Sequence, residues 1–236
     1  MTPYSRPPLG GSPARYLAKA ASDLAGAGNT YDASTTMWRG RSGTAWFDGA
    51  RATLEAPSLT GGRCVYCEHD RCSSVDHFIP RRTCPDRTFD WENWIPACQK
   101  CNTTKRNQFS ADLLDPSGPD YAFEDHFEFK FATGEFDLLT TKAEASEPVF
   151  GLNEVRLVEW RREHFEQIQA DVAEYHRHQQ NGDHGKARIR RNTIRTTRFR
   201  TVFQTVLRWH RHPRGRLLLD SDCVAALDAR PEIRTW

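Results

Sequence analysis

Two closely spaced cysteine pairs set the tightest limit on how this chain can fold: Cys64-Val-Tyr-Cys67 and Cys98-Gln-Lys-Cys101, separated by thirty residues. Two residues between cysteines let a tight turn point both sulfurs at one ion, and two such turns complete a tetrahedral site of four thiolates. Zinc is the expected metal, because thiolates favour it and because tetrahedral coordination suits it. Such a site is closed to water and substrate, so its expected role is structural.

Three further cysteines fall outside this pattern. Cys72 and Cys84 lie between the pairs, and Cys223 stands alone. A disulfide framework is unusual in a cytosolic chain of this size, so we interpret Cys72 and Cys84 as buried thiols or as competitors for the metal. The two pairs by themselves fit a structural ribbon or a binding module about as well as part of a catalytic unit, and the function has to be inferred from the residues around them.

The composition is that of an ordinary soluble globular protein. Of the 236 residues, 38% are hydrophobic and 27% are charged, and the net charge is +2. The first residues lack the apolar stretch of a signal peptide, and no apolar run approaches the length of a membrane span. We therefore predict a cytoplasmic protein with no membrane partner.

The chain divides into three predicted segments. They are a helical and arm region at 1–60, a cysteine-rich unit at 61–110, and a stretch at 111–236 in which an acidic hairpin segment precedes a helical C-terminal region with a basic helix. Residues 1–12 are rich in Pro, Gly and Ser, which predicts a loose arm.

Apolar residues at helical spacing predict helices at 13–25 and around 46–54. Alternating aromatic residues at Phe127–Phe131, followed by a Thr-Gly turn, predict a hairpin. A further helix is expected from Asn153, which we interpret as its N-cap, and another from about Lys186 to His210.

Three short motifs surround the cysteine pairs. Asp76-His77-Phe78-Ile79-Pro80 lies between them, Glu92-Asn93 lies before the second pair, and Asn102-Thr-Thr-Lys105-Arg106 follows it directly. A histidine has an unperturbed pKa of about 6.5, so at neutral pH it is a free base able to take a proton from water. His77 is therefore the candidate general base, although a histidine beside an aspartate also occurs as a packed core residue.

In order, these elements read C-x-x-C, D-H-x-x-P, Asn, and C-x-x-C-N-x-x-K, a pattern that resembles the HNH endonuclease family. The resemblance implies an α+β fold, in which a ββα-metal catalytic unit with its zinc knuckle is embedded in a mainly helical protein. It also implies hydrolysis of phosphodiester bonds that leaves a 5′ phosphate.

The resemblance also implies roles for individual residues. His77 takes the proton of the attacking water, and Asp76 and Asn102 ligate a catalytic Mg²⁺ or Mn²⁺, ions that favour hard oxygen donors. Asn93 is expected to hold the loop that orients the histidine, although an ordinary turn residue is an equally good interpretation. Because Asn102 directly follows Cys101, a zinc ion that fixes the cysteine is expected to fix the asparagine as well.

Basic residues mark two places where nucleic acid is expected to bind. Lys105 and Arg106 lie one turn after Asn102 and are candidates for phosphate contacts, with a solvated helix face as the alternative. The stretch from Lys186 to Arg216 has eleven Lys or Arg and no acidic residue. This pattern favours phosphate binding over a protein interface. Its candidate nucleic-acid-binding residues are Arg188, Arg191, Arg195 and Arg198. The acidic segment 112–147 would repel a duplex, and its role stays open.

Short matches outside the cysteine-rich unit, among them Leu114-Asp115-Pro116 and Gly151-Leu152-Asn153, resemble the HNH subunit of Septu-type anti-phage systems, and similar nucleases accompany some retrons. This resemblance implies a partner ATPase and a role in phage defence, with DNA as the substrate and RNA as the alternative. A stand-alone restriction or homing-type HNH enzyme is one competing interpretation. A non-catalytic zinc module that only binds nucleic acid is another, against which the intact Asp76, His77 and Asn102 argue.

Overall fold

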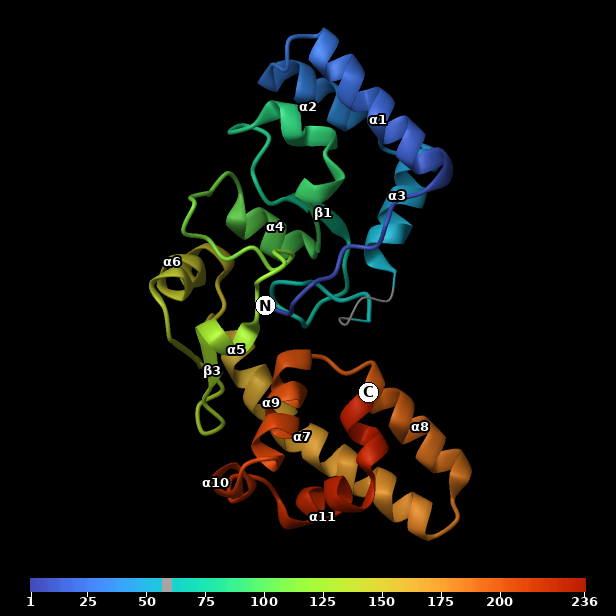
Figure 1. Cartoon of the computed structure of the whole chain (residues 1–236), viewed down its shortest axis with the longest axis vertical. Helices are drawn as coiled ribbons and strands as arrows, with labels where there is room; N and C mark the ends of the chain where they lie inside the picture. The colour runs from blue at the N-terminus through green and yellow to red at the C-terminus, as the bar shows by residue number, and fades with distance from the viewer. Residues whose placement is uncertain (57–60) are drawn as a thin grey trace. The chain divides into compact units, whose positions relative to one another are not determined.

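The computed structural model describes residues 1–56 and 61–236, which form two compact units. Unit 1 comprises Met1–His126 and Leu138–Leu152, and unit 2 comprises Phe127–Asp137 and Asn153–Trp236. Helices dominate and two small two-stranded sheets accompany them in the described part of the chain, so the predicted α+β class is confirmed (Figure 1). The boundaries of the units do not coincide with the three segments expected from the sequence, and that three-part organisation stays a prediction.

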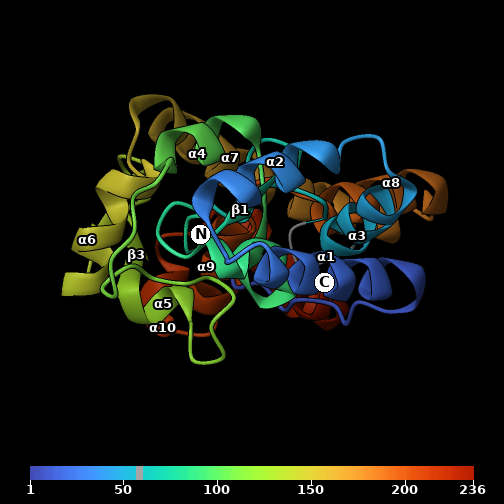
Figure 2. The same cartoon turned by 90° about the horizontal axis from the view of Figure 1, so that it is seen from above.

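Three helices precede the cysteine-rich part of unit 1. They are α1 (Gly11–Gly26), α2 (Tyr31–Gly40) and α3 (Ala45–Glu55). The first and third were expected from their apolar spacing, and they lie side by side (Figures 1 and 2). Helix α2 was not expected, because its sequence is polar. It begins where the Thr30 hydroxyl accepts a hydrogen bond from the Ala33 amide at 3.2 Å, and it buries Ser34 and Trp38.

An aromatic cluster forms the centre of unit 1. Trp38 of α2, Phe47 of α3 and Trp94 meet edge to face, with ring centroids 5.2–5.9 Å apart. Trp94 begins strand β2 (Trp94–Ala97), all of whose residues are buried. The N-terminal helices are therefore packed directly against the strand that leads into the second cysteine pair.

Strand β1 (Ser74–His77) pairs antiparallel with β2, in a register that places His77 opposite Trp94 and Asp76 opposite Ile95. Helix α4 (Gln99–Lys105) follows β2 and contacts β1. Two strands and a helix in this order are the ββα arrangement expected from the sequence. The remaining elements of unit 1 are η1 (Pro85–Phe89), η2 (Trp91–Asn93), α5 (Phe123–His126) and α6 (Thr141–Phe150).

The first residues do not form the loose arm expected for 1–12. Met1, Thr2 and Tyr4 are buried, the Thr2 amide donates to the Val65 carbonyl at 3.0 Å, and the Tyr4 hydroxyl donates to the Leu54 carbonyl at 2.8 Å. The prediction was wrong because proline and glycine report local backbone preference, whereas the contacts that fix this segment come from residues far along the chain.

Unit 2 contains the expected hairpin, with β3 (Phe127–Phe129) and β4 (Phe136–Leu138). The long helix α7 (Val155–Gln180) was also expected, but its N-cap is Glu154 rather than Asn153. The Asn153 side chain instead bonds the backbone N–H and C=O of Phe136, each at 2.9 Å. A side-chain amide can satisfy both groups of one residue, so Asn153 fastens the hairpin to the start of α7.

The single helix predicted from Lys186 to His210 is two helices, α8 (His184–Arg195) and α9 (Arg200–His210). Phe199, which the prediction placed inside one helix, adopts a left-handed conformation with φ of 47° and breaks the run there. The buried Phe199 side chain therefore lies at the turn between the two helices. Helices α8 and α11 both contact α7 (Figure 1). The remaining elements are α10 (Pro213–Arg216), α11 (Ser221–Ala229) and η3 (Pro231–Thr235).

The hairpin turn of unit 2 depends on a glycine. Gly134 has φ of +87°, and a Cβ there would lie 2.1 Å from the Val158 carbonyl oxygen of α7. We predict that Gly134→Ala lowers the free energy of unfolding by at least about 2 kcal/mol, because it adds both backbone strain and a backbone clash. Gly185→Ala is the matched control, since Gly185 lies in α8 with open space around its Cβ position. Chemical denaturation of both variants tests this, and equal stability of the two would contradict it.

Candidate active site

Four cysteines, Cys64, Cys67, Cys98 and Cys101, bring their sulfurs within 4.8 Å of one another, and all four are buried. A tetrahedral zinc ion with Zn–S bonds of about 2.3 Å separates its sulfurs by about 3.8 Å. The Cys67 and Cys98 sulfurs lie 3.9 Å apart. The donor set, its spacing and its burial therefore fit zinc, and the clustering of these four cysteines is confirmed.

The backbone around each pair explains how the sulfurs converge. The first turn closes through a hydrogen bond from the Glu68 amide to the Cys64 carbonyl at 2.9 Å, with Glu68 in the left-handed region at φ of 59°. In the second pair, Cys98 is the N-cap of α4, and its sulfur accepts from the Cys101 amide at 3.4 Å. Burial raises the pKa of the Cys64 thiol well above its usual range, so a thiolate there requires a cation beside it.

The two other cysteines of this region lie outside the sulfur cluster. Cys72 is half-buried, and burial raises its pKa to about 12, which keeps it a neutral thiol. Cys84 is half-buried as well and precedes η1 as its N-cap. Neither is grouped with the four sulfurs, so the choice of ligands made from the symmetric spacing agrees with the structure.

His77 lies at the end of β1 and is only 7% exposed. Its Nε2 lies 2.9 Å from the Thr88 carbonyl oxygen, which also accepts from the indole N–H of Trp94 at 2.9 Å. Because a carbonyl oxygen can only accept, Nε2 carries the proton and Nδ1 carries the lone pair. Burial lowers the pKa of His77 to about 3, against the opposing effect of the Thr88 bond, so the imidazole is neutral at physiological pH.

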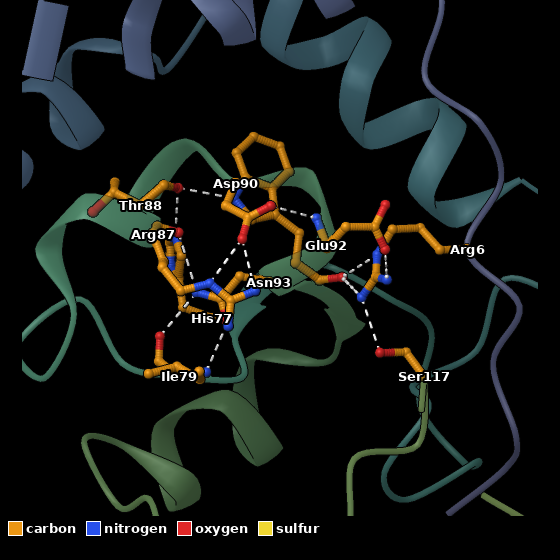
Figure 3. A network of polar contacts seen from close by, with 10 residues as sticks. Arg6, His77, Ile79, Arg87, Thr88, Asp90, Glu92, Asn93 and Ser117 are labelled. Atoms are coloured by element: carbon orange, nitrogen blue, oxygen red, sulfur yellow. Dashed lines mark hydrogen bonds and ion pairs between the residues drawn. The ribbon is translucent and has the colours of Figure 1, made fainter. Parts of the chain in front are cut away.

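Asn93 holds the loops on either side of the histidine together (Figure 3). Its side-chain oxygen accepts from the Ile79 amide at 2.8 Å, and its Nδ2 donates to the carbonyls of Ile79 at 2.9 Å and Arg87 at 3.1 Å. The residue is 1% exposed, so these bonds satisfy groups that water does not reach. Asn93 therefore joins the loop after His77 to the turn that supplies the Thr88 carbonyl.

A second set of bonds ties the same turn to the N-terminal segment (Figure 3). Arg6 forms an ion pair with Glu92 at 2.7 Å and donates to the Trp94 carbonyl and to the Ser117 hydroxyl. The Asp90 carboxylate accepts from the Glu92 amide at 2.9 Å and caps η2. The backbone around His77 is thus held by the Asn93 side chain and by Arg6 of the N-terminal segment.

Asp76 is buried beside His77, where its carboxylate contacts two side chains of the same chain and also lines the pocket. Its carboxylate accepts a hydrogen bond from the Tyr66 hydroxyl at 2.6 Å and forms an ion pair with the Lys105 ammonium at 3.1 Å. Burial raises the pKa of Asp76, while Lys105 and Tyr66 oppose that rise. Lys105 also donates to the His77 carbonyl at 2.8 Å and is 0% exposed. It was expected to contact phosphates, but an ammonium enclosed in this way acts as the internal counter-ion of Asp76.

Asn102 follows the zinc-ligand candidate Cys101 on α4, and its Nδ2 donates to the Ser74 hydroxyl and the Val75 carbonyl, both at 3.3 Å. Together with Asp76 and His77 it lines a pocket of about 220 Å³. A carboxylate and an amide oxygen at one pocket suit an ion such as Mg²⁺, which keeps several waters and takes few protein ligands. The donor chemistry therefore fits the expected divalent ion.

Comparison with known proteins shows what this arrangement is similar to. Residues 64–108 match the model of the HNH endonuclease family. These residues form an HNH domain. A stretch of 52 residues is 35% identical to the Septu protein PtuB of Bacillus thuringiensis, and the match covers 20% of this chain and 20% of that relative. The chain thus spans about a fifth of the curated relative that it matches. No solved structure matches the chain.

Residues outside the HNH domain complete its pocket. Tyr31 and Trp38 of α2 line it together with His77, and the Trp38 ring meets the His77 ring edge to face at 4.4 Å. Arg81 and the exposed Arg106 line it as well. The sequence motif could not reveal the contribution of α2, because the family pattern begins at Cys64.

The basic residues of the predicted C-terminal site lie on unit 2. Arg188, Arg191, Arg195 and Arg198 are exposed on α8 and in the turn after it. Arg190 of the same helix instead pairs with Asp171 at 2.7 Å and with Glu174 at 2.5 Å, both on α7. The basic stretch is therefore divided into an exposed face and a structural one.

In the part of the chain that the structure describes, no helix combines the length and apolar character needed to cross a membrane.

We predict that Cys98→Ser releases the zinc of the HNH domain, from about one ion per chain to almost none, because a serine hydroxyl replaces one of four thiolates. The domain then unfolds at lower denaturant concentration, since metal binding is coupled to folding. Cys72→Ser is the matched control, with unchanged zinc content. Elemental analysis of the purified proteins and denaturation curves measure both effects. A zinc-loaded, fully stable Cys98→Ser protein would rule out the assignment.

Proposed function

We propose that this chain is a metal-dependent HNH endonuclease that hydrolyses phosphodiester bonds of DNA as the nuclease subunit of an anti-phage defence complex. The match of residues 64–108 to HNH endonucleases supports the nuclease, and the similarity to Septu protein PtuB supports the defence role. The observation that carries the catalytic part is His77, a neutral imidazole at a pocket shared with Asp76 and Asn102.

His77 is the general base of this proposal. Its Nε2–H stays bonded to the Thr88 carbonyl, which leaves Nδ1 to take the proton of the attacking water. No hydrogen bond from the described residues reaches Nδ1, so no internal donor competes for its lone pair. The negative charge of a bound phosphodiester raises the pKa of His77 from its low resting value, because a nearby anion favours the imidazolium. The base thus strengthens when substrate is bound.

Asp76 and Asn102 are the proposed ligands of Mg²⁺ or Mn²⁺, which supplies charge neutralisation at the leaving 3′ oxygen when bound. Lys105 and Tyr66 fix the orientation of the Asp76 carboxylate. Asn102 is fixed by its neighbour Cys101 and by its bonds to β1. A misplacement of about 1 Å can reduce a rate a hundredfold, so the sulfur cluster serves catalysis by fixing α4 against β1.

The exposed arginines of α8 are proposed to bind nucleic-acid phosphates. Four of them, Arg188, Arg191, Arg195 and Arg198, share a region without acidic residues in sequence. Arg106 at the pocket is proposed to do the same beside the catalytic residues. A protein interface is the alternative for α8, since a basic helix face also fits an acidic partner surface.

A partner ATPase is the proposed regulator, by analogy with Septu-type systems and the similarity to Septu protein PtuB. The alternative is a stand-alone restriction or homing-type nuclease. Plasmid DNA and RNA, each incubated with Mg²⁺ or Mn²⁺ with and without the product of the neighbouring gene, separate the two. Cleavage by the chain alone favours the stand-alone enzyme, and cleavage only with the partner favours the complex.

We predict that His77→Ala lowers cleavage by about 10²–10⁴-fold, the usual contribution of a general base, while zinc content stays unchanged. His212→Ala, an exposed histidine of unit 2, is the control and keeps wild-type activity. Initial rates on whichever nucleic acid the wild type cleaves provide the measurement. Wild-type rates in a folded His77→Ala protein would exclude this mechanism and favour a zinc module without catalysis.

We predict that replacing Arg188, Arg191, Arg195 and Arg198 together by Gln weakens nucleic-acid binding and flattens its salt dependence, by about 0.9 in the log–log slope for each phosphate that is no longer neutralised. Arg190→Gln is the control on the same helix, because its charge is already paired within unit 2. Fluorescence anisotropy between about 50 and 200 mM salt, a range over which such slopes are resolved, measures both. An unchanged slope in the quadruple variant would assign this face to a protein partner.

A further inference from the structure

Two half-buried arginines share one tryptophan ring beside the catalytic pocket. The Arg41 guanidinium carbon lies 3.5 Å from the centre of the Trp38 ring and 4.5 Å from that of Phe47. The Arg81 guanidinium carbon lies 5.7 Å from the centre of the same Trp38 ring. One guanidinium on an indole is a common cation–π contact, but a second positive charge near the same ring adds repulsion.

Neither arginine is neutralised by the described residues. Arg41 donates to the Trp38 carbonyl, while its Nε is buried without a hydrogen-bond partner. Arg81 makes long contacts of 3.5 Å to the Ser34 carbonyl and 3.4 Å to the Thr35 hydroxyl. All of these acceptors are uncharged, and no carboxylate within residues 1–56 and 61–236 forms an ion pair with either arginine.

Burial lowers the pKa values of both arginines, and the charge of the neighbouring arginine contributes to the shift of Arg41. The pKa of Arg41 falls to about 10, chiefly through burial and secondly through Arg81. The pKa of Arg81 is lowered as well, chiefly through burial. Two partly desolvated positive charges without a counter-ion are unfavourable, and an anion bound by the two guanidinium groups lowers that cost.

The location of the pair indicates which anion. Arg81 lines the pocket with His77, Asp76 and Asn102, and Trp38, the ring that both arginines contact, packs against His77 at 4.4 Å. Guanidinium groups bind phosphate oxygens through paired N–H donors. The Trp38 indole contacts both arginines and His77. A phosphate bound by the arginines would therefore lie at a fixed position relative to the general base.

We propose that Arg41 and Arg81 bind a backbone phosphate next to the scissile one, so that helix α2, which lies outside the HNH domain, completes the substrate site. This inference rests on the proposed nuclease function and adds positioning residues to it. The arginines fix the position of the strand, and His77 acts on the neighbouring phosphate.

The test uses the full chain with His77→Ala, which binds without cleaving. Anisotropy of fluorescein-labelled DNA, duplex and single-stranded, is measured against salt for Arg41→Gln, Arg81→Gln and the double variant. Each substitution is expected to weaken binding by up to about tenfold and to lower the salt slope by about 1. Arg15→Gln, an exposed arginine of α1, is the control for removal of one charge from the same unit.

Two further variants separate phosphate binding from a structural role. Arg81→Gln alone is informative if Arg41→Gln disturbs α2, because Arg81 lies outside that helix and does not cap it. Arg81→Lys keeps the charge and removes the paired donors, so it is expected to recover the salt slope and part of the affinity. A purely structural role predicts no such recovery and predicts a lower unfolding midpoint instead.

The outcomes distinguish this inference from the proposed function. Arginine variants that bind like Arg15→Gln, or a parent protein that binds no DNA, would overturn the inference, whereas cleavage by the wild type would still support the nuclease. Weakened binding in a chain that never cleaves would support the phosphate site and count against the nuclease. In a cleaving enzyme, a rise in KM that exceeds the fall in kcat supports the positioning role.

Discussion

Four sulfurs held within 4.8 Å of one another bring the turn before β1 and the start of α4 together beside the pocket. As thiolates they would repel one another, and burial makes the Cys64 thiolate costly, so the cluster is stable only with a cation or with retained protons. One pair belongs to the turn before β1 and the other to the start of α4. Their convergence places the carboxylate of β1 and the amide of α4 at one pocket, as the proposed chemistry needs.

Several elements of the chain follow from local sequence. The apolar pattern predicts α1, α3 and α7, and each C-x-x-C pair predicts a tight turn, because these inferences use residues within a few positions of one another. The convergence of the two pairs, which are thirty residues apart, was expected because four thiolates suit one zinc ion. The position of His77 beside Asp76 and Asn102 was expected from the family pattern, and all three line one pocket. Their catalytic roles stay predictions.

The errors arise where distant residues decide. Lys105 is a lysine on a short helix, and only the fold shows that it is enclosed against Asp76. Asn153 has the local signature of an N-cap, but the Phe136 backbone offers it two bonds instead of one. Phe199 continues an apolar stripe in sequence, while its positive φ ends the helix. A helix cap contributes only about 1 kcal/mol, so for Asn153 the two bonds to a distant backbone outweigh the local preference.

Unit 1 is formed by two separate stretches of the chain, which limits where the chain can be cut into fragments. The path leaves unit 1 after His126, returns at Leu138 and leaves again after Leu152. The returning stretch contains α6, which contacts α4, and Phe150, whose ring stacks on Tyr66 at 4.5 Å. Tyr66 in turn bonds Asp76. A fragment that stops at residue 126 would contain every HNH motif and still lack the aromatic support behind its acidic side chain. The compact unit around the pocket is therefore discontinuous in sequence, and a domain swap or fusion designed on the motif boundaries alone would separate the site from part of its own support.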